Sequence, residues 1–289
     1  MDSAIGIIGG SGLYEMEGLE EVREIDVPTP FGLPSDTLVE GRLGGRRLVF
    51  LPRHGRGHRF LPSEVPYRAN IWALKSVGVE WIISISAVGS LEEDVRPGEI
   101  CLPDQFIDRT WGRESTFFGD GLVGHVAMAD PVCADLRRAL WDTRRAAGVP
   151  FHLGGTYVCI QGPQFSTRAE SFWYRSMGAR VIGMTNATEA RLAREAELCY
   201  ATVALVTDYD CWHETEEEVS VEAVLEVLRR NVDTARRIVR EAAARVPRER
   251  TCPCKDAARF AVLTDPDRIP PETRRRMELL LGRYLEGEG

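Results

Sequence analysis

Short continuous runs of apolar residues alternate along this chain with longer stretches in which apolar positions recur every three or four residues. Runs of strand length predict strands buried on both faces, and the helical spacing predicts helices packed by one face. The predicted strands are residues 4–9, 46–51, 80–87, 152–160, 180–183 and 199–207. The predicted helices are residues 67–77, 131–146, 167–178, 187–197 and 219–244, then a linker at 247–255, a short buried segment at 257–263 and a last helix from about residue 270.

The alternation of strands and helices predicts the α/β class, with a single large twisted mixed β-sheet surrounded by helices. The sequence contains no internal repeat and no low-complexity segment. No stretch before residue 247 has the composition of a linker, so residues 1–247 are predicted to form one domain. Residues 248–289 are then expected to be a C-terminal extension that packs on the same domain.

Composition narrows the functional class. The 289 residues are 44% hydrophobic and 28% charged, and the net charge of −8 argues against nucleic-acid binding over the general surface. No apolar run reaches membrane-spanning length and no signal peptide is recognisable, so we expect a cytoplasmic protein without a membrane segment. Only two of the 36 basic residues are lysine. Heat adaptation and a GC-rich genome explain this bias equally well.

Two carboxylates follow the strand predicted at 199–207. Asp208 and Asp210 are spaced i, i+2, which on a strand places both side chains on one face. Neighbouring carboxylates repel, so at least one is expected to have a raised pKa and to hold a proton near neutral pH. Such a pair suits protonation of a poor leaving group or hydrogen bonding to an amino-bearing heterocycle. Taken alone, it fits a solvated strand end or a helix cap equally well.

Other polar residues also follow predicted strands. Gly-Gly-Ser-Gly at 9–12 frees backbone N–H groups for an anion, but it lacks the spacing of a dinucleotide fingerprint and alone favours a plain tight turn. Arg53 and His54 lie on a glycine-rich loop that suits an oxyanion such as phosphate, with an exposed basic loop as the alternative. Ser86 and Ala87 end a buried strand, where a hydroxyl needs a partner.

Three further segments carry candidate residues. Phe165 can stack on a flat ring or fill the core, and Ser166 or Thr167 can simply cap the next helix. Thr185 ends another strand with a hydroxyl, and a helix cap is again the alternative. His125 has no local partner, and a lone histidine is usually structural. Together the strand ends predict a sheet edge that binds an anion beside a heterocycle.

The seven cysteines lie at positions 101, 133, 159, 199, 211, 252 and 254. They include no CxxC pair, which argues against a zinc site. Cys252 and Cys254 are separated by one proline. They fit either a small strained disulfide, as in hyperthermophile proteins, or idle thiols. The odd number of cysteines leaves at least one free thiol.

These segments, in order, resemble the purine nucleoside phosphorylase family. The resemblance runs from residue 4 to about 235 and rests on Gly-Gly-Ser-Gly-Leu at 9–13, Arg-His-Gly at 53–55, Tyr-Arg-Ala-Asn at 67–70, Gly-Ser at 89–90, Gly-Pro-Gln-Phe at 162–165, Ala-Glu at 169–170, Gly-Met-Thr at 183–185 and Thr-Asp at 207–208. Within the family, the 5′-methylthioadenosine phosphorylases carry runs like Phe-Ser-Thr-Arg-Ala-Glu-Ser at 165–171 and Thr-Asp-Tyr-Asp-Cys-Trp at 207–212. The C-terminal Cys-x-Cys resembles an archaeal thermophilic branch of that group.

The resemblance implies a purine nucleoside phosphorylase-like fold and reversible phosphorolysis of 5′-methylthioadenosine to adenine and 5-methylthioribose 1-phosphate. The phosphate-binding residues carried over are Ser11, Arg53, His54, Ser86, Ala87 and Thr185. The nucleoside-binding residues carried over are Phe165 facing the base, Ser166 beside it, Met184 against the ribose, Val221 and Val224 in the 5′-methylthio pocket, and His125 from a neighbouring subunit. Asp208 and Asp210 are implied as the catalytic pair that contacts N7 and the exocyclic amino group of adenine.

Two positions bear on the choice of base. The 6-oxopurine enzymes of the family place Glu after the aromatic residue and Asn at the strand end, where this chain has Ser166 and Asp208. A carboxylate accepts from a 6-amino group, so the resemblance implies adenine specificity. Thr188 stands before Glu189 where many relatives have proline, and a looser helix start is expected there.

The resemblance also implies a homotrimer or homohexamer with small-molecule substrates and no metal or other cofactor, phosphate being a co-substrate. If disulfides form, Cys252–Cys254 is the first pairing expected and Cys133–Cys199 the second. Three alternatives stay open. They are a phosphorylase of adenosine, or of inosine and guanosine; a nicotinamide-dependent oxidoreductase that uses the glycine turn at 9–12; and a non-catalytic nucleoside sensor.

Overall fold

The computed structural model of the chain describes residues 3–213 and 221–285, without the side chains of Ser11 and of residues 221–230. Its strands form one eleven-stranded mixed sheet. The strands are β1 (Ala4–Gly9), β2 (Glu20–Ile25), β3 (Leu38–Leu43), β4 (Arg46–Pro52), β5 (Val79–Ser90), β6 (Ile100–Leu102), β7 (Gln105–Arg109), β8 (Phe151–Leu153), β9 (Thr156–Ile160), β10 (Ala179–Gly183) and β11 (Cys199–Asp208).

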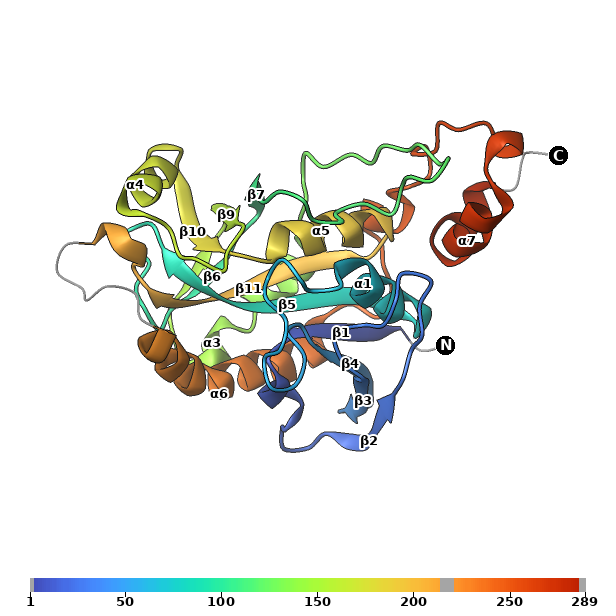
Figure 1. Cartoon of the computed structure of the whole chain (residues 1–289). Helices are drawn as coiled ribbons and strands as arrows, with labels where there is room; N and C mark the ends of the chain where they lie inside the picture. Colours follow the sequence, from blue (N-terminus) through green and yellow to red (C-terminus); the bar gives the residue numbers. More distant parts are fainter. Residues whose placement is uncertain (1–2, 214–220, 286–289) are drawn as a thin grey trace.

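Helices cover both faces of this sheet. The α-helices are α1 (Tyr67–Ser76), α2 (Ala134–Trp141), α3 (Arg144–Ala147), α4 (Arg168–Ser176), α5 (Asn186–Glu195), α6 (Val221–Arg245) and α7 (Pro271–Leu285). Short 3₁₀ helices are η1 (Ser11–Tyr14), η2 (Asp210–Trp212), η3 (Pro253–Asp256) and η4 (Pro266–Arg268). Figure 1 shows α6 along one side of the sheet and α1 and α5 on the other.

Strand β5 is the centre of the sheet. It pairs in parallel with β1 and β11 and antiparallel with β10. The order continues through β4, β3 and β2 on one side and through β9 and β7 on the other, while β6 and β8 extend from β11. The predicted α/β class with a single mixed sheet is therefore confirmed. The parallel strands β1, β5 and β11 bring their carboxyl ends to the same edge, where open α/β sheets bind ligands.

The alternation of side chains along β11 divides the core between the two faces of the sheet. Cys199, Ala201 and Val203 pack with apolar residues of α2 and α6, whereas Tyr200 packs with residues of α1, α5 and α7. Both faces are apolar because helices cover both. Burying a large apolar side chain contributes about 1.5–3 kcal/mol. The polar residues at the carboxyl end of β11 are therefore attached to a strand that is packed on both faces.

The helix predicted over residues 131–146 is wrong in its extent. α2 begins three residues later and stops at Trp141, and α3 follows only after Thr143. The Thr143 hydroxyl donates to the Leu140 carbonyl at 2.7 Å. A side chain that bonds to its own backbone competes with the helical ladder, so the helix is interrupted here.

The strand predicted over residues 152–160 is also divided, into β8 and β9. Gly154 and Gly155 lie between them with φ values of 81° and 108°, a left-handed conformation that glycine adopts readily. Strands β2, β3, β6 and β7 were not predicted. β2 is largely exposed and β6 has three residues, so neither has a clear apolar pattern. The remaining predicted strands and α-helices are confirmed to within a few residues.

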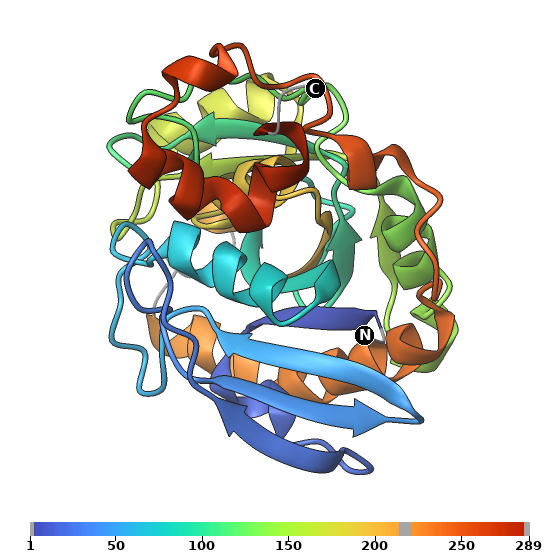
Figure 2. The ribbon, with the colours of Figure 1, turned by 90° about the vertical axis from the view of Figure 1, so that its right-hand side faces the viewer.

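The C-terminal segment folds back onto the helices of the main sheet. Figure 2 shows α7 beside α1, and Met277 and Leu281 of α7 belong to the same buried cluster as Ile71 of α1. This contact buries apolar surface that α7 would otherwise expose to solvent. The division into a domain at 1–247 and an extension at 248–289 stays a prediction.

The segment 257–263 was predicted to be buried, and this is confirmed for only two of its six apolar residues. Ala258 and Ala261 are buried, but Phe260 is 85% exposed and Leu263 is 65% exposed. The chain forms turns here, with one isolated bridge at Val262. Because turns point successive side chains in different directions, the apolar run does not mark a buried strand.

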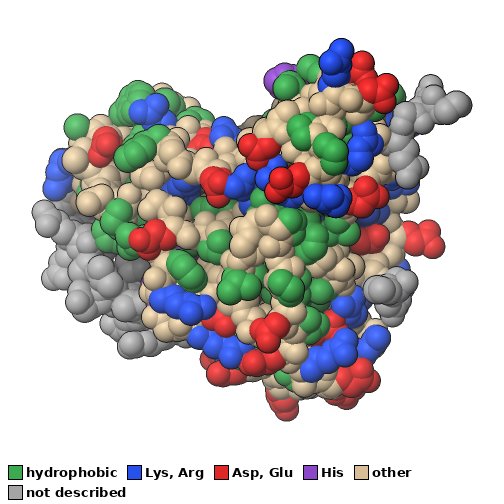
Figure 3. Space-filling view, turned by 45° about the vertical axis from the view of Figure 1, so that its right-hand side comes forward, with side chains coloured by type: hydrophobic (Ala, Val, Ile, Leu, Met, Phe, Trp, Pro, Cys, Tyr) green, Lys and Arg blue, Asp and Glu red, His purple; other side chains and the backbone are tan. Residues whose placement is uncertain are grey.

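The surface carries charge of both signs. Figure 3 shows basic and acidic side chains intermingled on the face that it presents, with apolar side chains gathered between them. This face is unlike the one-signed basic surface that nucleic-acid binding requires, in keeping with the net charge of −8. Within the described ranges, no helix has the length and apolarity needed to cross a membrane.

Candidate active site

A cavity of about 710 Å³ opens at the edge where β1, β5 and β11 end, a size typical of small-molecule sites. Its lining residues fall within segments 9–13, 52–62, 85–89, 160–165, 182–185 and 205–210, joined by Val232 and Ala235 of α6. The predicted site residues that line it are Arg53, His54, Ser86, Ala87, Phe165, Met184, Thr185, Asp208 and Asp210. The fold therefore gathers in one place predicted site residues from Arg53 to Asp210, 157 positions apart in the sequence.

Asp208 and Asp210 adjoin each other in the cavity wall, but they do not lie on one strand. β11 ends at Asp208, and Asp210 begins η2 with a positive φ of 52°. The prediction that both carboxylates share one strand face is therefore wrong, and a tight turn brings them together instead. The Asp208 carboxylate accepts hydrogen bonds from the Thr207 hydroxyl at 2.6 Å and from the Asp210 backbone N–H at 2.8 Å. These bonds fix the orientation of the Asp208 side chain.

Both carboxyls have raised pKa values. Burial raises the pKa of Asp208 against the opposing hydrogen bond from Thr207. Burial raises the pKa of Asp210 to about 6, the Asp208 charge adds to this, and the nearby Ser171 hydroxyl opposes it. The predicted raised pKa is thus confirmed, with burial rather than repulsion as its main cause. Among the described residues, the buried Asp210 Oδ2 has no hydrogen-bond partner, so it is available to a ligand.

Gly89 allows the two carboxylates to lie against β5. A Cβ atom at this position would come within 2.9 Å of Asp208 Oδ1 and 3.3 Å of Asp210 Cβ. The first distance is shorter than non-bonded carbon and oxygen atoms tolerate. A residue without a side chain is therefore required for this close approach.

Arg53 lies beneath the cavity, paired with Glu189, and the two residues are 4% and 2% exposed. Arg53 Nε donates to Glu189 Oε1, and Arg53 Nη2 donates to Glu189 Oε2 at 3.3 Å. Nη2 also donates to Ser84 Oγ at 2.6 Å, and Nη1 donates to the Ile85 carbonyl at 3.1 Å. Burial alone would lower the pKa of Arg53, but the Glu189 carboxylate raises it above its usual value. These bonds use four of the five N–H groups of the guanidinium, so within the described structure one remains for an anion.

Hydroxyl groups complete this part of the wall. The Thr185 hydroxyl donates to Asn186 Oδ1 at 3.1 Å, and Asn186 Nδ2 donates to Thr202 Oγ1 at 2.8 Å. Thr185 is the N-cap residue of α5 and Ser86 lies near the end of β5, so a bound anion would meet hydroxyls beside a helix N-terminus. Thr188 is fully buried in the first turn of α5. The looser helix start expected there stays a prediction.

His54 is a neutral side chain at physiological pH. Burial, together with the Arg53 charge, lowers its pKa to about 4. Its Nδ1 lies 2.8 Å from the Phe60 carbonyl oxygen, which can only accept, so we assign the ring proton to Nδ1. Nε2 is then an acceptor. This nitrogen can receive a hydrogen bond from the O–H group of hydrogen phosphate.

Phe165 and Met184 give the cavity apolar surface. Phe165 is 44% exposed, so its ring is accessible to a flat ligand. Arg113, which no local motif marks, donates from Nη1 to the Met184 carbonyl and from Nη2 to the Gln161 carbonyl, both at 2.6 Å. It thereby joins the turn that carries Phe165 to the end of β10. We assign Arg113 a positioning role that periodicity along its own segment could not reveal.

The structure places two of the remaining predicted site residues, Ser166 and His125, outside the cavity wall. Ser166 is partly buried, its hydroxyl has no partner among the described residues, and Thr167 caps α4 instead. His125 is exposed on a loop outside the cavity wall. The predictions whose side chains lie outside the described residues are Ser11 at the start of η1, and Val221 and Val224 in the first turn of α6.

All seven cysteines are free thiols in this structure, so neither predicted disulfide is confirmed. The Cys211 thiol lies beside the cavity and donates to the Ser166 carbonyl at 3.2 Å. A separate buried cluster contains Cys133, Cys199, Cys252 and Cys254. This cluster is at the Cys199 end of β11, roughly 30 Å along the strand from Asp208.

Comparison with known proteins agrees with this geometry. The family model described as the phosphorylase superfamily matches residues 4–244. A protein of Geobacter sulfurreducens named S-methyl-5′-thioadenosine phosphorylase is 59% identical over 286 residues, which cover 99% of this chain and 100% of the relative. The alignment therefore spans nearly all of this chain and the whole of the relative.

Solved structures give the same result. A methylthioadenosine phosphorylase from an antarctic soil metagenomic library superposes with a TM-score of 0.92 at 50% identity, covering 97% of this chain and all of its own. The methylthioadenosine phosphorylase of Schistosoma mansoni in complex with adenine superposes with a TM-score of 0.83 at 44% identity, covering 89% of this chain and 96% of its own. The resemblance of the C-terminal Cys-x-Cys to an archaeal thermophilic branch of these enzymes stays a prediction. The chain belongs to the phosphorylase superfamily and, within it, to the family of the S-methyl-5′-thioadenosine phosphorylases.

Proposed function

We propose that this protein catalyses the reversible phosphorolysis of 5′-methylthioadenosine to adenine and 5-methylthioribose 1-phosphate. The observation that carries the proposal is a single cavity that combines two acids of raised pKa with a set of anion-binding donors. Asp208 and Asp210 supply the acids, and Arg53, Ser86 and Thr185 supply the donors. The names of the relatives support the same reaction.

The Asp pair acts on the departing base. As the bond between C1′ and N9 breaks, its electron pair moves onto the purine, and a proton delivered to N7 neutralises that charge. An ordinary aspartic acid has a pKa of about 3.9 and is a poor acid at neutral pH. The raised pKa values of Asp208 and Asp210 let the pair retain a proton. Asp208 is suited to contact both N7 and the exocyclic amino group of adenine, and the unpartnered Asp210 Oδ2 beside it is available to hydrogen-bond to the ligand.

Phosphate is the nucleophile that forms the new bond to C1′. The sugar acquires positive charge in the transition state, and a phosphate dianion held close to C1′ stabilises that charge. Because Glu189 already balances the charge of Arg53, phosphate is bound mainly by neutral donors and by one remaining N–H of Arg53. We infer that this leaves its oxygen atoms nucleophilic. The proposed reaction requires phosphate as co-substrate and no metal ion or organic cofactor.

The test is release of adenine from 5′-methylthioadenosine, measured with and without phosphate and with inosine in parallel. Phosphate-dependent release of adenine with little action on inosine is the expected result. Comparable turnover of inosine would indicate a broader purine nucleoside phosphorylase and would contradict the proposed role of Asp208 in base choice. Binding of the nucleoside without turnover would indicate a sensor, and tight binding of a nicotinamide dinucleotide would indicate an oxidoreductase.

Replacing Phe165 with alanine is expected to raise KM for 5′-methylthioadenosine by about tenfold, because stacking of a base on an aromatic ring contributes roughly 1–3 kcal/mol. kcat should change less, since the stack forms in both the ground state and the transition state. Steady-state kinetics at saturating phosphate measure both constants. Phe260→Ala is the matched control, because that ring is 85% exposed and lies outside the cavity wall. An unchanged KM in Phe165→Ala would show that the ring does not contact the base.

The rate is expected to depend on the ionisation of the Asp pair. The acid must be protonated to act, so kcat/KM for 5′-methylthioadenosine should fall as pH rises and the pair loses its proton; burial raises the pKa of both carboxyls, that of Asp210 to about 6. The measurement is a pH profile in which the concentration of phosphate dianion is held constant, because phosphate itself titrates in this range. A profile that stays flat through neutral pH contradicts the assignment of the pair as the acid.

We also propose that the chain assembles into a homotrimer or homohexamer. Large apolar side chains are exposed at Trp111, Phe172 and Trp173, and surfaces of this kind favour burial against another copy. His125, exposed and outside its own cavity, would then reach the cavity of a neighbouring subunit. Light scattering measures the assembly, and a monomer at micromolar concentration would contradict the proposal. The cytoplasmic location and the heat adaptation stay predictions.

A further inference from the structure

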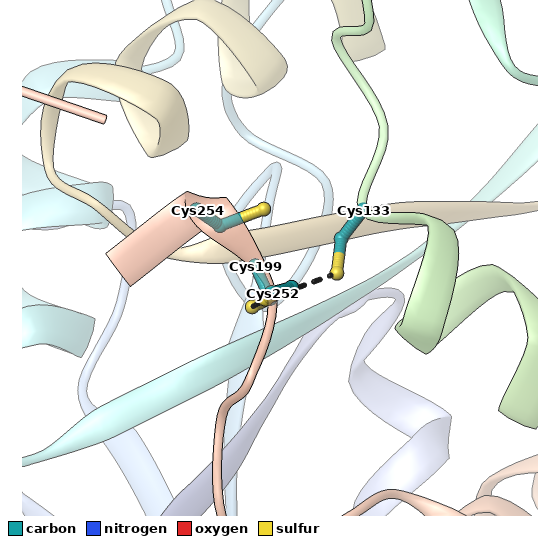
Figure 4. Close-up of side chains that lie close together, drawn as sticks. All are labelled: Cys133, Cys199, Cys252 and Cys254. Atoms are coloured by element: carbon teal, nitrogen blue, oxygen red, sulfur yellow. Dashed lines mark hydrogen bonds between the residues drawn. The ribbon is translucent and has the colours of Figure 1, made fainter. Parts of the chain in front are cut away.

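Four thiols converge at the end of β11 that lies away from the cavity. Their sulfur atoms all lie within 4.8 Å of one another, and all four residues are buried. The Cys252 sulfur lies 3.3 Å from that of Cys199 and 3.8 Å from that of Cys133. Figure 4 shows the side chains of Cys133, Cys199, Cys252 and Cys254 directed toward a common centre.

Two of these distances are close to the edge of a tetrahedron of sulfur atoms around a zinc ion. Zinc–sulfur bonds of 2.3 Å in tetrahedral geometry separate the sulfur atoms by about 3.8 Å. The distances from the Cys252 sulfur to the sulfur atoms of Cys199 and Cys133 lie within 0.5 Å of that value. Cys252 contacts two thiols at once, an arrangement that a metal centre satisfies and a single disulfide does not.

The ligands come from three separate segments of the chain. Cys133 is the N-cap residue of α2, Cys199 is the first residue of β11, and Cys252 and Cys254 flank the start of η3. In the sequence, the absence of a CxxC pair argues against a zinc site, but that argument considers only the spacing of neighbouring cysteines. The fold supplies the same four-thiolate set from elements more than fifty residues apart.

The surroundings suit a centre with negative charge. Four thiolates around Zn²⁺ leave a net charge of −2. Cys133 is the N-cap residue of α2, so its sulfur lies beside the positive end of that helix. The charge of the Arg194 guanidinium acts on the neighbouring Cys254 sulfur. Amide donors and a nearby cation are the partners that stabilise thiolate ligands.

We propose that Cys133, Cys199, Cys252 and Cys254 bind one zinc ion as a closed tetrathiolate site. All four positions are filled by protein sulfur, so the site is structural rather than catalytic. Binding displaces the thiol protons to solvent. The ion joins α2 and β11 to the segment between α6 and α7, and so fastens the C-terminal segment to the sheet. The site is independent of the proposed phosphorolysis, because none of its residues lines the cavity.

The first test is metal analysis of the full chain expressed with zinc and dialysed against metal-free buffer. We expect about one zinc per chain, as for a closed structural site. Replacing the zinc with Co²⁺ should produce the intense thiolate-to-cobalt absorption and the visible bands of tetrahedral CoS₄. X-ray absorption at the zinc edge should show four sulfur atoms at about 2.3 Å.

Variants locate the ion. Cys254→Ser should lower zinc retention against a chelator by more than about tenfold, since even the loss of an outer partner costs 10–100-fold. Cys101→Ser is the matched control, because Cys101 is equally buried, lies outside the cluster and contacts the Gly154 carbonyl, which a serine hydroxyl can also reach. This control should retain zinc as the unaltered chain does.

Three outcomes would overturn the proposal. The first is a zinc-free chain in which four thiols resist alkylation until reduced, which would establish two disulfides. The second is a chain whose seven thiols all react freely and that takes up neither zinc nor cobalt. The third is a Cys254→Ser variant that holds zinc as tightly as the unaltered chain. If Cys254→Ser does not fold, the cobalt spectrum of the unaltered chain decides the question alone.

Discussion

Replacing Asp208 with asparagine is expected to lower kcat for 5′-methylthioadenosine by roughly 10²–10⁴-fold, the usual contribution of a positioned general acid. The amide cannot deliver a proton to N7, and its NH₂ group places a donor where the 6-amino group needs an acceptor. The substitution conserves shape, and the side-chain oxygen can still accept from one of its two donors, the Thr207 hydroxyl or the Asp210 backbone N–H. We therefore expect the fold to be kept and the loss to fall on kcat.

Turnover of inosine distinguishes the role of Asp208 as an acid from its role in the choice of base. An amide can donate to the 6-oxo group of inosine, so Asp208→Asn should reduce turnover of inosine much less than turnover of 5′-methylthioadenosine. Steady-state kinetics on both nucleosides measure the difference. Asp104→Asn is the control, because that carboxylate follows β6, pairs with Arg137 at 2.7 Å and lies outside the cavity wall. Equal losses on the two substrates would show that Asp208 does not set the choice of base.

The parts of the site that the sequence predicts are those that follow buried strands. The apolar runs of β1, β5 and β11 are covered on both faces, so their burial and strand length are visible in the sequence alone. Parallel strands end at one edge, and for that reason Ser86 and Asp208 could be expected to lie close together. The position of Asp210 could not be predicted in this way, because a turn with a positive φ, and not the period of the strand, places it beside Asp208.

The parts that the sequence does not predict depend on distant partners. Glu189 bonds to Arg53 across 136 positions, and nothing in its own helix distinguishes it from a surface acid. Arg113 reaches carbonyl groups 48 and 71 positions away. The four clustered cysteines come from three segments, so a rule based on local CxxC spacing could not find them. Tertiary contacts of this kind leave no periodic pattern.

Glu189→Gln is expected to lower the free energy of unfolding by about 3–5 kcal/mol, the cost of removing one partner from a buried ion pair. The carboxylate accepts from Arg53, from the Ser84 hydroxyl at 2.7 Å and from the Tyr200 hydroxyl at 2.8 Å. A glutamine would turn an NH₂ group toward donors and leave the Arg53 charge unbalanced in a buried position. Urea unfolding at neutral pH measures the change.

A matched surface pair and a double variant distinguish this loss from a general effect of removing a carboxylate. Glu241→Gln breaks the Glu241–Arg245 pair, whose side chains are 31% and 40% exposed, and should change stability by less than about 1 kcal/mol. Arg53→Gln should also destabilise the protein strongly. The double variant Arg53→Gln with Glu189→Gln should lose less than the sum of the two single losses, because it leaves no unpaired buried charge. Strictly additive losses would show that the two side chains do not depend on each other, and the proposed neutralisation of Arg53 beneath the phosphate would then be wrong.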